Sequence, residues 1–542
     1  MAALTRPWSR ADTDRGITPR RARRKYTEEV LFPTMTFAVF FTVVLGVSWR
    51  LRSRPMIWKL FLIAASYVFY GWWDPRFLVL LVASQVGNTV AGYTIARAAD
   101  DGARRWAVRV GVTANLVLLG VFKYYGFFVE TLLTVLRPLG LAPTPLLVEI
   151  GLPVGISFFT FCAISYLVDL GRKEIPPANV VDVALFLGFF PHLVAGPIVR
   201  ASEFLPQLRR MPNPDAVDAT RAARLIARGL VKKVIIANVI AQTLADPVFG
   251  SPRAYGNVDI AAAIYGYAVQ IYADFSGYTD IAIGTALLLG IKFPENFNRP
   301  YTAASLSDFW RRWHMTLSRW LRDYLYIPLG GNRAGELLTY RNLAVTMLLG
   351  GLWHGARWTF VVWGAYHGVG LAVERLTERR RATSREDRLA QRPRWSKVRS
   401  ELGLETSHGD VQVVDVETGQ ITTEPTEQMP RPPSLWMARF WVFHFVAIGW
   451  VFFRSESLSG ALTLLWRLVT HWSGPEVTTM AALAAIAVGL GAQYLPPRIG
   501  LWAEWWVSRL PPVAQAAGFA LVLLACDVLG PQGVAPFIYF QF

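Results

Sequence analysis

The chain has 542 residues, of which 53% are hydrophobic, 13% aromatic and only 17% charged. Soluble domains contain about 45–50% apolar and about 25% charged residues, so neither a set of soluble domains nor a disordered chain fits this composition. The formal net charge is +17. The basic residues cluster between apolar stretches, and no nucleic-acid recognition motif accompanies them. This pattern favours cytoplasmic loops of a membrane protein over a nucleic-acid partner.

Apolar segments recur along the chain and predict an all-α, polytopic protein that lies in the lipid bilayer of the cell (plasma) membrane. Several segments are shorter than the roughly 20 residues that cross a bilayer, so we expect re-entrant and interfacial helices beside about 10–12 transmembrane helices. The candidate segments are 31–48, 57–73, 77–96, 107–135, 150–170, 183–199, 233–247, 259–290, 341–352, 357–373, 436–453, 476–495 and 513–530.

Composition divides the chain into four parts. Residues 1–29 form a basic, cytoplasmic N-terminal extension that lacks the apolar region of a cleavable signal peptide. Residues 30–374 form a membrane-embedded core, and residues 435–542 form the C-terminal transmembrane helices. The segment between them, 375–434, is too polar to lie in lipid, and its basic first half predicts a charged cytoplasmic loop.

The first candidate site is Asp274-Phe-Ser-Gly-Tyr-Thr-Asp280, within the apolar stretch 260–291. Ionisable groups inside an apolar span are costly and are therefore candidates for function. On a helix, Asp274 and Tyr278 lie four residues apart and share one face, where they could bind substrate. The alternatives are a cation site, a proton relay, or carboxylates that only brace neighbouring helices. No metal site is expected, because no other residues stand nearby with metal-ligand spacing.

The second candidate site is the segment 305–326, which is rich in Trp, Arg and Tyr. Ser305 followed by Asp308 predicts a helix start, and the three- and four-residue spacing of the aromatic residues predicts one helix at the membrane interface. His314 with several arginines could hold an anionic donor such as coenzyme A; a structural histidine is the alternative. The candidate substrate-binding residues here are Arg311, Arg312, Trp313, Ser318, Arg322 and Asp323.

The third candidate site is Leu349-Gly-Gly-Leu-Trp-His-Gly-Ala-Arg-Trp358, where His354 stands in an apolar span among glycines. Glycine lets another backbone approach closely, so a ligand channel is one interpretation of Gly350, Gly351 and Gly355. A neutral imidazole in a water-poor pocket suits general-base catalysis. The alternative is a histidine that only forms a hydrogen bond to a neighbouring helix.

These segments resemble the membrane-bound O-acyltransferase family, and most closely its alginate O-acetyltransferase branch. The central motifs are Phe293-Pro-Glu-Asn-Phe-Asn-Arg-Pro-Tyr301, Phe309-Trp-Arg-Arg-Trp-His314, Arg322-Asp-Tyr-Leu-Tyr-Ile-Pro-Leu-Gly-Gly-Asn-Arg333 and Leu352-Trp-His-Gly-Ala356. Further similar pieces are Phe190-Pro-His-Leu-Val-Ala-Gly-Pro-Ile-Val-Arg200, Asp274-Phe-Ser-Gly-Tyr278, Gly449-Trp-Val-Phe-Phe-Arg454 and Phe537-Ile-Tyr-Phe-Gln-Phe542.

The resemblance implies the helical membrane fold of that family and its reaction, in which an acyl group passes from a thioester donor through the membrane to a hydroxyl acceptor. It assigns the buried catalytic histidine to His354 and a second polar position to His314. It implies acetyl-CoA or another acyl thioester as the cytoplasmic donor, with no bound cofactor. It also implies O-acetylation of a cell-envelope or exported polysaccharide, directly or through an extracytoplasmic acetyltransferase partner of the SGNH type.

The chemistry of such a transfer sets what the two histidines must do. A cytoplasmic thioester and a hydroxyl on the other side can meet only at a water-poor site, where a base takes the hydroxyl proton without exposing the thioester to hydrolysis. We assign this role to His354, and a donor- or oxyanion-facing role to His314. The alternatives are D-alanyl or other acyl transfer to an envelope polymer and, in a different class, a polytopic transporter or flippase.

Overall fold

The computed structural model describes residue 32 and residues 34–72, 74–140, 153–333, 335–390, 411–414, 421–424 and 434–530. The N-terminal extension and the motif Phe537–Phe542 lie outside the described residues. In the described part, the fold is built of α-helices joined by short π- and 3₁₀-helices, so the prediction of an all-α protein is confirmed. Two short strands, β1 (Val411–Val414) and β2 (Ile421–Glu424), pair antiparallel within the charged segment.

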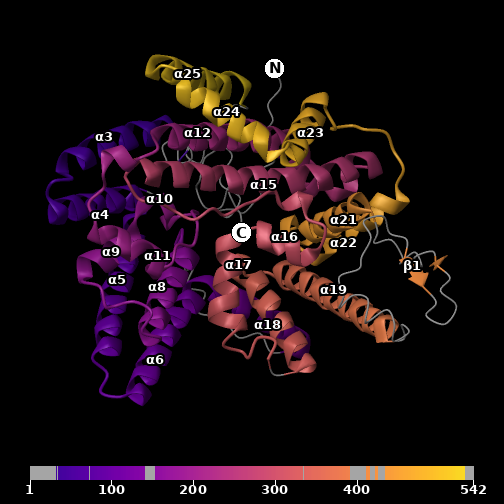
Figure 1. Cartoon of the computed structure of the whole chain (residues 1–542), viewed down its shortest axis with the longest axis horizontal. Coiled ribbons are helices and arrows are strands. Elements are labelled where there is room, and N and C mark those ends of the chain that lie inside the picture. Colours follow the sequence, from indigo (N-terminus) through magenta and orange to yellow (C-terminus); the bar gives the residue numbers. More distant parts are fainter. Residues whose placement is uncertain are drawn as a thin grey trace.

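The first half of the chain supplies the helices that lead up to the long central helix (Figure 1). They are α3 (Met35–Leu51), α4 (Pro55–Gly71), α5 (Pro75–Ala96), α6 (Asp101–Leu119), η1 (Gly120–Tyr124), α7 (Tyr125–Leu136), η2 (Arg137–Leu139), α8 (Ile156–Gly171), α9 (Val180–Gly188), α10 (Phe190–Leu193), α11 (Ala201–Phe204), η3 (Leu205–Arg209), η4 (Pro214–Ala216), α12 (Ala219–Leu230), η5 (Val231–Ala237), α13 (Asn238–Ile240), η6 (Ala241–Ala245), α14 (Asp246–Gly250) and η7 (Pro252–Ala254).

The second half begins with the central helix and carries both histidine motifs. Its helices are α15 (Asn257–Leu288), η8 (Pro300–Thr302), α16 (Leu306–Arg312), α17 (Met315–Leu321), η9 (Arg322–Tyr326), α18 (Glu336–His354), α19 (Trp358–Ala390), α21 (Leu435–Arg454), α22 (Leu458–Thr470), α23 (Met480–Tyr494), α24 (Pro497–Arg509) and α25 (Pro512–Leu529). Helix α19 therefore continues well past residue 374, into the segment predicted as a charged loop.

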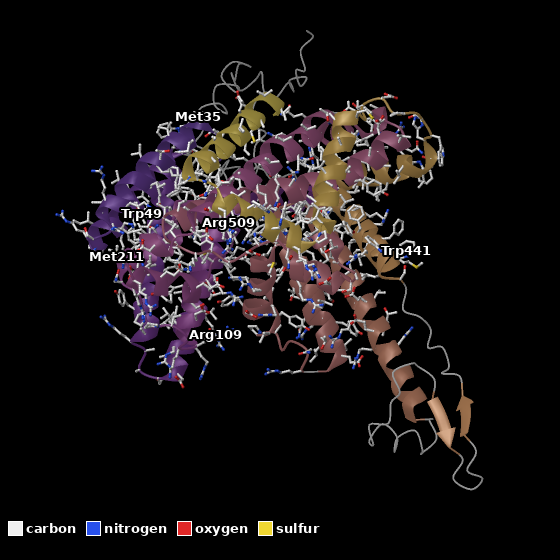
Figure 2. The ribbon with its side chains drawn as sticks, turned by 45° about the horizontal axis from the view of Figure 1, so that its top comes forward. Met35, Trp49, Arg109, Met211, Trp441 and Arg509 are labelled. Carbon is white, nitrogen blue, oxygen red and sulfur yellow. The ribbon has the colours of Figure 1, made fainter. Side chains whose placement is uncertain are left out.

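Helix α15 forms the core of the molecule, with α12 lying along it (Figure 1). Every residue of α15 from 266 to 287 is buried, as expected of a helix that is largely apolar all round and surrounded by other helices. Helix α3, on which Figure 2 labels Met35 and Trp49, contacts the end of α15, because the Trp49 indole donates to the Leu288 carbonyl at 3.1 Å. This hydrogen bond attaches α3 to the C-terminal end of the buried helix.

The number of helices that are long and apolar enough to cross a membrane is lower than the number predicted from the sequence. In the described part, four qualify: α5, the continuous segment Asp101–Leu139, α21 and α25. A fifth crossing results if α23 and α24, bent by 97°, act as one span. The predicted number of about 10–12 is higher because several predicted segments, such as α3, α4 and α8, are helices of at most 17 residues, too short at 1.5 Å per residue for a perpendicular crossing.

The segment predicted as one interfacial helix is instead broken, and two of its tryptophans are buried. The Ser305 hydroxyl accepts from the Asp308 amide at 3.0 Å, which confirms the predicted helix start. Helix α16 then ends at Arg312, and α17 begins only at Met315. Trp313 and Trp320 are only 2% and 6% exposed, so these rings pack inside the protein and the predicted interfacial position is wrong for them. Segments distant in the sequence supply the rings they pack on, which local spacing does not reveal.

Candidate active site

The two histidines that the sequence singled out lie close together in the structure. His314 lies at the junction of α16 and α17, and His354 is the last residue of α18. Both are buried, with exposed fractions of 0% and 5%. The Trp353 ring is 6.1 Å from the imidazole of His314 and 5.0 Å from that of His354, measured between centroids. Tertiary packing therefore brings both imidazoles against one indole.

His314 is held by an unusual backbone turn and by Asn296. Its φ of 42° lies in the left-handed region, which a non-glycine residue adopts only when its surroundings stabilise it. The Met315 amide donates to the Asn296 carbonyl at 2.9 Å, and the His314 Nδ1 lies 3.0 Å from Asn296 Oδ1. These contacts replace the helical hydrogen bonds that a continuous helix would have made. They point the His314 ring into the protein.

The same contacts fix the tautomer of His314. Asn296 Oδ1 accepts hydrogen bonds from the Thr316 amide at 3.2 Å and from the Thr316 hydroxyl at 2.9 Å, so this atom is the amide oxygen. An oxygen acceptor requires Nδ1 of His314 to carry the hydrogen. In the neutral ring, Nε2 then presents its lone pair, and it has no hydrogen-bond partner among the described residues. His314 is oriented to accept a proton or a hydrogen bond.

Aromatic rings from three helices surround the imidazole of His354. Trp353 of α18, Trp363 of α19 and Phe453 of α21 lie with their centroids 5.0, 5.2 and 5.1 Å from it, each steeply inclined to its plane. These rings exclude bulk water from the imidazole. A base in such a place keeps a thioester away from hydrolysis while it acts on a hydroxyl.

The glycines around His354 serve helix packing. A Cβ at Gly351 would overlap the Phe360 carbonyl oxygen, and a Cβ at Gly355 would overlap the Phe360 ring. A Cβ at Gly364, on the facing helix, would overlap the Met347 carbonyl oxygen. Helices α18 and α19 therefore approach closely through small residues, as membrane helices often do (Figure 1). This helix contact accounts for Gly351 and Gly355, whereas Gly350 lies outside it, with Leu321 Cδ1 as the nearest atom to an added Cβ.

We expect Gly351→Ala to destabilise the protein, while Gly350→Ala, one residue away, leaves its stability nearly unchanged. The added methyl at residue 351 meets backbone, which must move, at a cost of about 1–3 kcal/mol. At residue 350 the nearest atom is the flexible Leu321 Cδ1, at 3.3 Å. The measurement is thermal unfolding of both purified variants in the same detergent. Equal unfolding temperatures would contradict the packing role of Gly351.

The predicted substrate-binding residues of the second site are mostly engaged with the protein. Arg312 is paired with Asp308 at 2.8 Å, and the Ser318 hydroxyl donates to the Trp313 carbonyl at 3.3 Å. Trp313 packs on Trp450 with 4.8 Å between centroids, while Arg311 is exposed. The Ser318 hydroxyl is thus engaged with the backbone, and this contact gives no support to its predicted role in substrate binding.

Arg322 and Asp323 belong to a cluster of three arginines and two carboxylates around one phenol ring. Asp323 is paired with Arg322 at 2.6 Å and with Arg200 at 2.8 Å. The guanidinium groups of Arg200 and Arg172 lie 5.3 and 5.5 Å from the centroid of the Tyr324 ring. Burial alone raises the pKa of Asp323, but the hydrogen bonds from Arg322 and Arg200 outweigh it and lower that pKa. Asp169 also accepts a hydrogen bond from the Tyr324 hydroxyl at 2.7 Å, so three cations face two carboxylates and leave an excess of one positive charge, which is suited to phosphate.

A row of packed rings joins this arginine cluster to the histidine pair. Tyr324 lies 5.2 Å from Trp320, which stacks on Phe161 at 3.7 Å with an interplanar angle of 9°. Phe161 lies 5.2 Å from Trp353, the indole that contacts both histidines. The cluster and the histidine pair are therefore parts of one continuously packed region.

The carboxylates of the first candidate site are paired with cations. Asp280 is bound by Arg228 at 2.6 Å and by Lys232 at 2.8 Å, and Asp274 is bound by Lys233. These pairs join α15 to α12 and η5, which fits the bracing interpretation. Among the described residues, no group of three or more His, Cys, Asp or Glu side chains could hold a metal ion. Tyr278 stacks on the Phe32 ring at 4.5 Å.

Lys123 was missed by the sequence analysis, although it stands inside the predicted span 107–135. Its ammonium donates to backbone carbonyls at the end of α18, including that of His354 at 3.4 Å. The rule applied to Asp274, that a charge within an apolar span is a functional candidate, would also have identified this lysine.

Comparison with known proteins adds independent findings. The sequence model of the membrane-bound O-acyltransferase family matches residues 170–406. The chain is 45% identical to probable alginate O-acetylase AlgI of Pseudomonas aeruginosa, over 93% of this chain and 98% of that protein. It is 36% identical to a peptidoglycan O-acetyltransferase of Helicobacter pylori over 76% and 74% of the two chains. It is 30% identical to a teichoic acid D-alanyltransferase of Streptococcus thermophilus over 43% and 60%.

Proposed function

The chain belongs to the membrane-bound O-acyltransferase family, and on this premise we propose that it moves acetyl groups from a cytoplasmic thioester to an envelope or exported polysaccharide. It is a multi-pass membrane protein and an O-acyltransferase. The acetyl group, the plasma membrane and the polysaccharide acceptor are the proposed refinements. Relatives named as an alginate O-acetylase and a peptidoglycan O-acetyltransferase, which the chain covers over most of their length, support them.

The observation that carries the proposal is the pair of buried imidazoles around Trp353. In the proposed reaction the acceptor hydroxyl oxygen attacks the thioester carbonyl carbon while His354 takes the hydroxyl proton. The carbon–sulfur bond then breaks, and the leaving thiolate receives that proton. A positioned general base contributes typically about 10²–10⁴-fold to such a rate. The surrounding rings exclude the water that would otherwise hydrolyse the donor.

The role of His314 follows from its tautomer. With Nδ1–H on Asn296, the neutral ring accepts a hydrogen bond at Nε2. A contact with a developing oxyanion therefore requires His314 to bind a proton at Nε2 first. If the acyl donor or the acceptor hydroxyl instead donates a hydrogen bond to Nε2, His314 needs no prior protonation. His314 faces the reacting groups in either case, and the assignment of His354 as the base is kept.

The arginine cluster is the proposed site for the anionic part of the donor. Coenzyme A carries phosphates, and guanidinium groups bind phosphate through paired hydrogen bonds. The packed row of rings between Tyr324 and Trp353 connects this cluster to the histidines. Acetyl-CoA fits this arrangement, and another acyl thioester with an anionic carrier fits it as well. The acceptor is a polysaccharide or an extracytoplasmic acetyltransferase of the SGNH type.

Labelled donors test the acyl group. Inside-out membrane vesicles that contain the protein receive acetyl-CoA or a D-alanyl thioester carrier, each with a radioactive acyl group. We expect alkali-labile acetyl label on the polysaccharide or on a partner protein, and none with the His354→Ala variant. Label from D-alanine alone would favour the D-alanyl alternative, to which a more distant relative belongs. Transport of an unmodified sugar without ester formation would favour the transporter alternative.

We expect His314→Ala to lower acetyl transfer by about 10- to 100-fold. This is the effect of losing one hydrogen bond to a group that is charged or becomes charged in the transition state. The variant also loses the hydrogen bond from Nδ1 to Asn296 Oδ1, so acetyl transfer is compared per folded molecule. Acetyl transfer per molecule is measured in membranes matched for protein content. His471→Ala, at an exposed histidine outside the site, is the control. An unfolded His314→Ala protein would return His314 to a structural role.

A further inference from the structure

A π-helical turn interrupts one candidate membrane span at the level of the active site. The continuous helical segment Asp101–Leu139 contains η1 (Gly120–Tyr124), and only 6% of its most apolar window is buried. Most of this span therefore faces outward, yet Lys123 and Tyr124 are only partly exposed. Single π-helical turns are uncommon and occur often at functional sites. A lysine at this depth requires a specific partner.

The partner is the end of helix α18. The last four carbonyls of a helix have no partner within it. The Tyr124 hydroxyl donates to the Leu352 carbonyl at 2.9 Å, and the Lys123 ammonium donates to the carbonyls of Trp353 and His354. Two adjacent side chains of η1 thus bind three of these four carbonyls.

Three acceptors surround the Nζ of Lys123. An ammonium group carries three N–H donors. Two reach the carbonyls of Trp353 and His354, and the third reaches the Ser157 hydroxyl at 3.0 Å. The positive charge also lies at the negative end of the α18 dipole, where a cation is stabilising. This arrangement fits a group that holds the backbone in place and not one that contacts substrate.

The backbone held in this way carries the imidazole of His354. Gly355 leaves the helix in an extended conformation, with φ −164° and ψ 151°, so the helical hydrogen-bond pattern ends at His354. We propose that Lys123 and Tyr124 are positioning residues that fix residues 352–354 and thereby place the His354 imidazole for proton transfer. This inference rests on the proposed function of His354.

The test compares turnover with donor binding. Lys123→Met removes the charge and the donors but keeps similar length, and a misplacement of about 1 Å at a reacting group can cost about 100-fold. We therefore expect kcat to fall by about 100-fold for Lys123→Met and several-fold for Tyr124→Phe, with KM for acetyl-CoA unchanged. Lys123→Arg keeps a cation and N–H donors, so its kcat should lie between those of Lys123→Met and the wild type.

The matched controls are a lysine and a tyrosine whose hydrogen bonds go to segments other than α18. Lys59 is a partly buried lysine paired with Asp182 at 2.6 Å, and the Tyr70 hydroxyl donates to the Val154 carbonyl at 2.9 Å. Lys59→Met and Tyr70→Phe should keep wild-type kcat per folded molecule. A cryo-electron microscopy structure of Lys123→Met in nanodiscs should show residues 352–354 displaced.

The outcomes separate this inference from the proposed function. Wild-type kcat per folded molecule in Lys123→Met, with His354→Ala inactive, would overturn the positioning role alone. An unmoved segment 352–354 would overturn it as well. A rise in KM without loss of kcat would make Lys123 a binding residue and would also overturn it. An active His354→Ala would instead refute the proposed role of His354.

Discussion

His354→Ala is expected to abolish polysaccharide acetylation while the protein inserts at normal levels and still binds the acyl donor. The base acts on the acceptor hydroxyl, so its loss removes the proton transfer and leaves donor binding intact; the cost is about 10²–10⁴-fold. His354→Gln keeps a similar size and a hydrogen bond but cannot take up a proton near neutral pH, so it should be nearly as inactive. Activity should also fall at low pH, because a protonated imidazole cannot accept the hydroxyl proton.

The measurement is ester content of the polymer and acetyl release from labelled donor, in membranes matched for protein amount. His192→Gln is the matched control, because His192 is also buried, at 2% exposed, and packs among Phe189, Phe204 and Phe293. A structural histidine at 354 would give the opposite order, with Gln near wild type and Ala destabilised. Substantial ester formation by His354→Gln would leave His314, whose Nε2 lone pair is already available, as the base.

Breaking the Lys233–Asp274 pair should give the largest loss of stability. The two side chains are only 2% and 6% exposed, so removal of one partner leaves a buried charge without its counter-ion. Such a change costs about 3–5 kcal/mol, whereas an exposed pair contributes about 0–1 kcal/mol. We expect Lys233→Met and Asp274→Asn each to lower the unfolding temperature strongly. The double variant Lys233→Met/Asp274→Leu, with an apolar pair, should recover much of it.

Lys173→Met is the control for this experiment. Lys173 pairs with Asp101 at 3.6 Å, and both side chains are about two-thirds exposed, at 67% and 70%. Its unfolding temperature should match that of the wild type. If Asp274→Asn unfolds at the wild-type temperature and loses donor binding, Asp274 belongs to the substrate path and not to the bracing of α15. Tyr278, on the same face of α15, would then deserve the same test.

The count of membrane helices shows why composition gave the class of protein but not its architecture. Hydropathy depends on residue type alone, so a membrane protein was predictable from 53% hydrophobic residues and the repeated apolar runs. Whether a run crosses the bilayer depends on its helical length and on what covers it. Residues 266–287 of α15 are all buried by other helices. No local sequence pattern distinguishes a helix buried by protein from a helix buried in lipid.

The broken helix at His314 shows a second limit. Spacing predicted continuous helix through residues 305–326, because each local step favoured it. The contacts that end α16 come from Asn296 and Asn298, which lie in a separate segment, and only folding brings their backbone to Arg312 and Met315. The left-handed backbone of His314 is stabilised by these distant contacts, so it left no sign in the local sequence.

By itself, the sequence determined that this protein lies in a membrane and at which positions charged residues interrupt the apolar spans. It also identified His314 and His354 as the residues to examine. Only the tertiary structure decided that both rings meet at Trp353, that Lys233 neutralises Asp274, and that Lys123 holds the end of α18. The physical reason is the range of the interactions. Hydropathy and helix-start signals depend on residues that are close together in the sequence. A buried charge or imidazole is stabilised by partners 18 to 231 residues away, which only the packed chain brings together.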